Sequence, residues 1–120
     1  MLPTYSRFKN KYTYKQRFTE ASNILIEYPH RIPVVCEKNV RSTNAPEIDK
    51  NKYLVPFDLT IGQFLHVIRK RIKLTENEAL FLTIGQIIPS NSSLMGNLYS
   101  YYKSGDLFLY IIYSTENTFG

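Results

Sequence analysis

Cys36 is the residue whose side chain could most readily act as a nucleophile, because it is the one cysteine in this chain of 120 residues. A cysteine nucleophile needs a nearby base and partial exposure to solvent. Cys36 instead alternates with Ile32 and Val34 along a β-like apolar segment, where a free cysteine behaves as a small hydrophobic residue. We therefore expect Cys36 to be buried in the core. A single cysteine also cannot form an internal disulfide, which indicates a cytosolic protein.

The histidines and carboxylates do not form an acid–base or metal site in this sequence. His30 falls in a turn after a proline, and His66 falls within a helical segment 36 positions later. Glu76 and Glu78 lie in a polar turn, where we expect both carboxylates to be solvated. No glycine-rich phosphate loop follows a strand-like segment. The sequence therefore predicts a protein without catalytic residues, metal or cofactor, which is not an enzyme.

Positive charge is concentrated at the amino terminus, although the net charge of the whole chain is only +5. Five cations precede the first acidic residue, Glu20: Arg7, Lys9, Lys11, Lys15 and Arg17. Such a basic arm suits acidic proteins, anionic lipid or nucleic acid. No RNA-binding aromatic signature accompanies it, so a nucleic-acid partner is not expected. A second basic group at residues 69–73 is typical of cations at the end of a helix.

Apolar periodicity predicts the elements that must position any binding surface. Phe18, Ala21, Leu25 and Tyr28 share one helical face, so residues 14–28 are expected to form a helix that Pro29 ends. A short helical turn is expected before it, in the basic arm. Residues 32–38 and 52–57 alternate as two strands.

The second half of the chain repeats this order of helix and strands. Thr60 and Gln63 have the spacing of a capping box at the start of a second long helix. Residues 79–84 are expected to form a strand. Ser92 or Ser93 is expected to cap a short helix that runs through residue 101. Residues 107–113 are almost continuously apolar, which is typical of a central strand covered on both faces.

This order predicts one α+β domain with a single sheet beneath helices rather than a doubly wound fold. Hydrophobic residues make up 43% of the chain and charged residues 21%, proportions that favour a globular domain over a disordered or fibrous chain. The longest apolar run has seven residues, 107–113, far short of the roughly 20 needed to cross a bilayer. The first ten residues lack the apolar core of a signal peptide.

Several segments, in order along about nine tenths of the chain, resemble the GABARAP family of lipid-conjugated autophagy modifiers. The matching segments are YPHRIPVVCEK at 28–38, KYLVP at 52–56, DLTIGQF at 58–64, IRKRI at 68–72, MG at 95–96, FLY at 108–110 and FG at 119–120. The resemblance implies a β-grasp, ubiquitin-like fold with a mixed four-stranded sheet and two additional N-terminal helices. It divides the chain into a basic helical subdomain at 1–28, a ubiquitin-like core at 29–113 and a conjugation tail at 114–120. The N-terminal arm matches the family poorly.

The resemblance also implies that the second strand is an exposed edge, on which a partner peptide with an aromatic-x-x-aliphatic motif adds as another strand. The implied aromatic pocket comprises Glu20, Ile24, Pro33, Val35, Lys52, Leu54 and Phe108. The implied aliphatic pocket comprises Tyr53, Val55, Pro56, Leu59, Phe64, Val67 and Ile68, with Arg71 at its rim. Acidic residues flanking the motif would meet Arg31, Lys50 and Lys52. An alternative is that Val55, Phe64 and Ile68 only build the core.

The resemblance implies that Gly120 is the residue joined to lipid. The resemblance implies that an ATP-using activating enzyme and a conjugating enzyme carry Gly120 as thioesters before the amine of phosphatidylethanolamine accepts it. Cargo receptors and adaptors with the peptide motif and a deconjugating cysteine protease are the other implied partners. The protein would be cytoplasmic, and after lipidation bound to autophagosome, vesicle or vacuole membranes. Family members commonly carry residues after this glycine, so Gly120 is either the natural end or a truncated one.

Two other functions remain open from the sequence. The chain could be an unconjugated ubiquitin-like binding module whose basic arm binds acidic partners such as tubulin or nucleic acid. It could also serve a plastid membrane, as some similar glycine-ended family members in apicomplexan parasites do.

Overall fold

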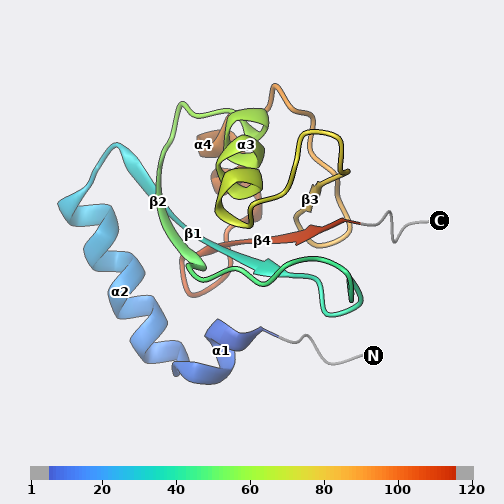
Figure 1. Cartoon of the computed structure of the whole chain (residues 1–120). Helices are drawn as coiled ribbons and strands as arrows, with labels where there is room; N and C mark the ends of the chain where they lie inside the picture. Colours follow the sequence, from blue (N-terminus) through green and yellow to red (C-terminus); the bar gives the residue numbers. More distant parts are fainter. Residues whose placement is uncertain (1–5, 116–120) are drawn as a thin grey trace.

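The computed structural model describes residues 6–115, which form four helices and four strands (Figure 1). In chain order the elements are α1 (Arg7–Lys11), α2 (Tyr14–Glu27), β1 (Arg31–Lys38), β2 (Lys52–Pro56), α3 (Ile61–Arg71), β3 (Phe81–Thr83), α4 (Met95–Tyr102) and β4 (Leu109–Ser114). This is the predicted order, including the short helix in the basic arm. None of the helices within residues 6–115 is long and apolar enough to cross a membrane.

The four strands form one mixed sheet in the order β2-β1-β4-β3. β1 pairs antiparallel with β2 and parallel with β4, and β3 pairs antiparallel with β4. β4 is therefore a central strand, as its apolar sequence predicted, and β2 lies at an edge. The mixed sheet and its helices confirm the predicted ubiquitin-like β-grasp fold.

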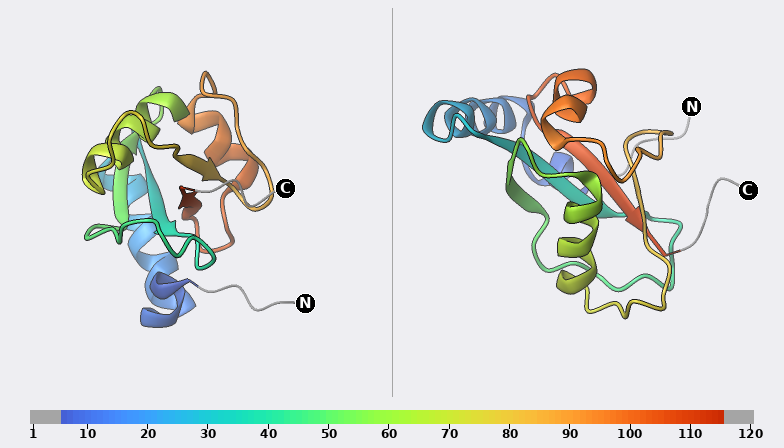
Figure 2. Two further views of the ribbon diagram at one scale, coloured as in Figure 1. Left: turned by 45° about the vertical axis from the view of Figure 1, so that its right-hand side comes forward. Right: turned by 90° about the horizontal axis from the view of Figure 1, so that it is seen from above.

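Helices cover both faces of the sheet, because alternate residues of each strand point to opposite faces. Ile32, Val34 and Cys36 of β1 belong to the main core, which also contains buried residues of α3 and α4. Val35, one position out of phase, belongs to a smaller core with Phe8 of α1 and buried residues of α2. Figures 1 and 2 show α3 beside the sheet, away from the N-terminal pair of helices.

Helix α2 forms where its spacing predicted, but it packs on a different face, and the predicted serine cap of the last helix is wrong. The inward residues of α2 are Arg17, Ala21 and Ile24, whereas Phe18 and Tyr28 are 41% and 44% exposed. The small core meets α2 about one position away from the apolar stripe at 18, 21, 25 and 28, and Ala21 is the buried member of that stripe. Helix α4 begins after Leu94 without a side-chain cap. Neither Ser92 nor Ser93 caps it; main-chain bonds such as Gly96 N–H to Phe57 O, at 2.8 Å, hold its first turn instead.

Candidate functional site

The outer edge of β2 carries main-chain groups that β1 does not use. The amide of Cys36 donates to Asn51 O at 2.7 Å, and the amide of Phe57 donates to His30 O at 3.1 Å. In an antiparallel pair hydrogen bonding alternates along each strand, so these two bonds fix the phase of the whole register. Lys52 and Leu54 therefore direct their N–H and C=O groups away from β1. This edge can accept one further strand.

Local sequence limits how that further strand can pair. Pro56 is the next residue in the outward phase, and it has no N–H to donate. Arg31 Nη1 donates to Leu54 O at 3.0 Å and so occupies an outward acceptor. The outward donors within β2 are consequently the amides of Lys52 and Leu54. These features favour a short, specific pairing over open-ended sheet extension.

The residues expected in the aromatic pocket come together between α2 and the sheet face behind β2. Ile24, Val35 and Phe108 are buried in the small core, and Leu54 packs partly buried against them. Lys52 Nζ forms an ion pair with the Glu20 carboxylate, which joins β2 to α2 above this apolar floor. An open hollow of about 600 Å³ runs along the same helix and is lined by Lys15, Gln16, Thr19, Glu20, Asn23, Ile24 and Glu27. All of these lining residues belong to α2, and Ile24 is the one that also lies in the small core.

The residues expected in the aliphatic pocket divide into a buried and an accessible group. Tyr53, Val55, Phe64 and Ile68 are buried in the main core. The Tyr53 and Phe64 rings meet edge to face with centroids 5.6 Å apart. Pro56 and Leu59 are half-buried, and Val67 and Arg71 are exposed. The second group is therefore accessible at the surface, and the first group is not.

The cations expected to meet acidic flanks are all exposed around β2. Besides the ion pair of Lys52, Lys50 Nζ lies 5.1 Å from the centre of the Tyr53 ring. Arg71 pairs with Asp49 through Nε–Oδ1, at 2.9 Å, and Nη2–Oδ2, at 3.3 Å. Both side chains of that pair are largely exposed, so it is of the kind that contributes at most about 1 kcal/mol. Arg31 and Lys50 give the β2 edge a positive rim, whereas Lys52 and Arg71 are each paired with a carboxylate.

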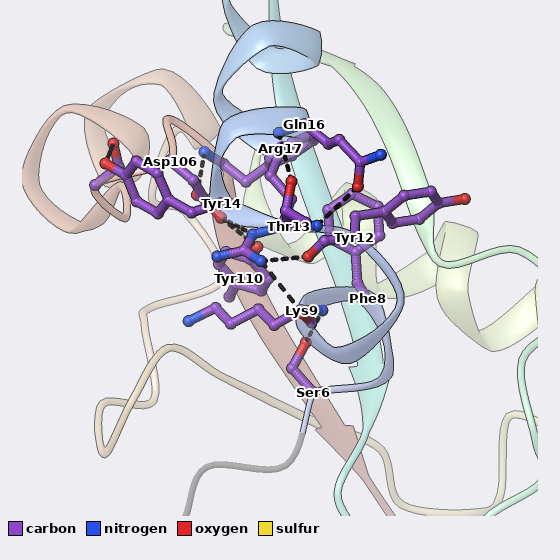
Figure 3. A network of polar contacts seen from close by, with 12 residues as sticks. Ser6, Phe8, Lys9, Tyr12, Thr13, Tyr14, Gln16, Arg17, Asp106 and Tyr110 are labelled. Atoms are coloured by element: carbon purple, nitrogen blue, oxygen red, sulfur yellow. Dashed lines mark hydrogen bonds and ion pairs between the residues drawn. The ribbon is translucent and has the colours of Figure 1, made fainter.

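Arg17 and Asp106 hold α2 in place, a role that the sequence analysis missed. Arg17 Nε donates to Asp106 Oδ2 at 2.8 Å, and Arg17 Nη1 donates to the carbonyls of Lys9 and Tyr12 (Figure 3). The ion pair is almost wholly buried. It therefore fixes the junction of α1 and α2 against the turn before β4. No local pattern identifies it, because the partners are 89 positions apart.

The groups that could do chemistry are separated or buried. Cys36 is fully buried, as predicted, and this burial raises the pKa of its thiol. His30 and His66 are exposed. Among residues 6–115, no three His, Cys, Asp or Glu side chains are grouped to hold a metal ion. Gly120, the expected conjugation residue, lies outside the described residues.

Comparison with known proteins supports the family resemblance of the sequence along nearly the whole chain. The family model "Autophagy protein Atg8 ubiquitin like" matches residues 16–120. Autophagy-related protein 8 of Mycosarcoma maydis is 52% identical over 115 residues, which are 96% of this chain and 97% of that protein. The Schizosaccharomyces pombe protein of the same name is 53% identical, with coverages of 96% and 94%. The crystal structure of Trypanosoma brucei ATG8 superposes with a TM-score of 0.89 at 40% identity, covering 98% of this chain and 100% of that one.

Proposed function

Because the chain belongs to the Atg8 family of autophagy ubiquitin-like proteins, we propose that it is a modifier joined through Gly120 to phosphatidylethanolamine. In the same proposal, the β2 edge recruits partner proteins to the modified membrane. The chain is the substrate of the conjugation chemistry and not its catalyst. Its place of action is the cytoplasm before conjugation and the autophagosome or vesicle membrane afterwards.

The proposed chemistry converts a carboxylate into an amide at Gly120. The carboxylate attacks the α-phosphorus of ATP on the activating enzyme, and pyrophosphate leaves. A cysteine thiolate of that enzyme displaces AMP to form a thioester, and the thiolate of a conjugating enzyme then takes over the acyl group. The lipid amine attacks this thioester, loses a proton and releases the thiol. Glycine suits these steps because it has no side chain to obstruct attack at its carbonyl carbon.

The observation that carries this half of the proposal is the family match, which extends through residue 120. The lipid supplies two acyl chains, and two chains anchor a protein stably where one does so only marginally. A cysteine protease of the same pathway would reverse the attachment by hydrolysing the amide.

The recruiting half of the proposal rests on the free edge of β2. An extended peptide can bond to the outward amides of Lys52 and Leu54, with its aromatic side chain packing against Leu54 and Ile24 between β2 and α2. Its aliphatic side chain, three residues later, would reach Pro56, Leu59 and Val67. Acidic residues before or within the motif would meet the cations of the rim. Cargo receptors and adaptors with aromatic-x-x-aliphatic motifs fit this description.

The basic-arm function receives less support. Four of the five cations of the arm make contacts within residues 6–115: Arg7 and Arg17 form ion pairs, and Lys9 and Lys11 lie over tyrosine rings. The ion pairs leave fewer of the arm's cations without a counter-ion for tubulin or nucleic acid than the sequence implied, whereas Lys9 and Lys11 keep their charge.

The direct test is reconstitution of the purified chain with activating and conjugating enzymes, ATP and liposomes containing phosphatidylethanolamine. Intact mass spectrometry should detect a gain of one lipid on the wild-type chain. It should detect no lipid on the Gly120→Ala variant. If the enzymes modify a known family member but leave this chain unmodified, the conjugation proposal is wrong.

A further inference from the structure

The loop after β1 wraps around the C-terminal end of β4 (Figures 1 and 2). The amide of Asn39 donates to Tyr113 O at 2.8 Å, and the Tyr113 hydroxyl donates to Pro46 O at 2.6 Å. Tyr113 is fully buried. Both ends of this loop segment, Asn39 and Pro46, are therefore hydrogen-bonded to Tyr113 near the end of β4.

Ser42 lies within this loop and contacts the first residue beyond β4. Its side chain is fully buried, and its Oγ accepts a hydrogen bond from the Thr115 amide at 3.1 Å. The Ser42 and Thr115 hydroxyls are also 3.4 Å apart. Main-chain bonds from Ser42 N to Asn39 O, at 2.9 Å, and from Ala45 N to Ser42 O, at 3.2 Å, hold the serine itself in place. Ser42 thus presents a rigid acceptor to the main chain of Thr115.

We propose that Ser42 is a positioning residue for conjugation, which fixes the point and direction from which the C-terminal segment leaves the domain. The inference rests on the proposed function, because it concerns how Gly120 reaches the enzymes that carry it. The proposal gives Ser42 no part in the reaction itself. It acts through Thr115, five residues before Gly120.

The physical reason is preorganisation. An enzyme that modifies Gly120 and also binds the domain must fix the main chain between them, and each residue that it has to order on binding lowers affinity. Holding Thr115 in advance removes part of that cost. Loss of the hydrogen bond should consequently weaken binding of the chain to the enzyme without changing the chemical step once the chain is bound.

The test is the kinetics of thioester formation on the activating enzyme with ATP, using the full chain as the varied substrate. We expect Ser42→Ala to raise KM about 3- to 10-fold with kcat within twofold of wild type. Ser42→Thr should keep KM near the wild-type value, because threonine retains the hydroxyl. Thr43→Ala is the matched control, since Thr43 is an exposed neighbour in the same loop. Thr115→Ala keeps the main-chain amide and should also resemble wild type.

Thr115→Pro gives a second, independent variant, because proline lacks the amide hydrogen that Ser42 accepts. It should reproduce the rise in KM even if Ser42→Ala fails to fold. Amide hydrogen exchange supplies a readout besides activity: the Thr115 amide should exchange at least tenfold faster in Ser42→Ala, while the amides of β4 and peptide affinity at β2 stay unchanged.

The outcomes separate this inference from the proposed function. Unchanged KM in both Ser42→Ala and Thr115→Pro overturns the positioning role, as does a fall in kcat accompanied by lost peptide binding, which indicates general loss of structure. If the wild-type chain forms no thioester with enzymes active on a known family member, the proposed function fails and this inference fails with it.

Discussion

At the scale of single residues, successive side chains of β2 point to opposite faces of the sheet, so that residues in the main core alternate with residues proposed to bind the peptide. Tyr53 and Val55 point into the main core and are 7% and 3% exposed. Leu54, between them, lies on the opposite face and packs only partly buried against the small core. A substitution at Leu54 should therefore affect the peptide edge more than the fold.

Leu54→Arg is expected to weaken binding of an aromatic-x-x-aliphatic peptide by at least about tenfold, because it places a charge at the apolar floor of the aromatic pocket. Isothermal titration calorimetry with the purified chain measures the effect. Val40→Arg is the control, since Val40 is 62% exposed on the loop after β1, and circular dichroism checks that both variants fold. Unaltered affinity in Leu54→Arg would mean that the pocket lies elsewhere.

At the scale of elements, caps and close contacts decide where each helix sits. Thr60 and Gln63 form the capping box of α3, with the Gln63 amide donating to Thr60 Oγ1 at 3.1 Å and the Thr60 amide to Gln63 Oε1 at 2.9 Å. Thr13 and Gln16 form the same box for α2. Helix α4 has no such cap and instead rests on the end of β2, where Gly96 approaches Phe57.

Gly96→Ala tests this close approach. A Cβ at this position would lie 2.9 Å from Phe57 O and 3.0 Å from Phe57 Cβ, so α4 must shift. We expect a loss of about 1–3 kcal/mol in the free energy of unfolding, although alanine is intrinsically the better helix former by about 1 kcal/mol. Urea unfolding measures the change, with the exposed Asn97→Ala in the same helix as control. A variant more stable than wild type would show that the contact leaves room for the methyl group.

At the scale of the whole molecule, a buried polar network fastens the N-terminal helices to the sheet. Asp106 accepts hydrogen bonds from Arg17, at 2.8 Å, from the Tyr110 hydroxyl, at 2.6 Å, and from the Phe108 amide, at 3.0 Å. Burial opposes ionisation of Asp106, but the hydrogen bonds from Tyr110 and Arg17 outweigh it and hold the pKa of this carboxyl below its usual range. The network thereby keeps α2, one wall of the proposed peptide site, against the domain.

Asp106→Asn should lower the free energy of unfolding at pH 7 by about 3–5 kcal/mol, because it leaves the Arg17 charge buried without its counter-ion. The lowered pKa of Asp106 adds a pH dependence. Its stabilisation is present above the unfolded-state pKa of about 3.9 and is lost as the pH falls through the lower folded-state pKa. The wild-type chain should therefore lose more stability than the variant between pH 5 and the acid range, roughly pH 2–3.

Chemical unfolding at a series of pH values measures that difference. Other carboxyls with lowered pKa, Glu47 and Asp49, remain in both chains, so the comparison isolates Asp106. Asp58→Asn is the control, because Asp58 is exposed. Equal losses of stability in acid for wild type and Asp106→Asn would contradict the assignment.

The sequence by itself determined the order of elements, the central position of β4 and the capping box of α3, because these depend on local spacing. Thr60 and Gln63 are three residues apart, and Ile32, Val34 and Cys36 alternate on one strand. The peptide edge and its pockets came from family motifs rather than from such spacing. The motifs give the positions of these residues in the chain, but they do not show which of the side chains are accessible.

Only the tertiary structure decided which side chains are buried and which distant residues meet. Spacing identifies a face of a helix but not the layer that the face will contact, so α2 buries Arg17 while Phe18, on its apolar stripe, is 41% exposed. The same limit applies to Phe64 and Ile68, which the structure places in the core. Ser42 and Thr115 are 73 positions apart, and their contact exists only because β1 and β4 are neighbours in the sheet. Such pairs depend on the packing of complete elements, which no local pattern encodes.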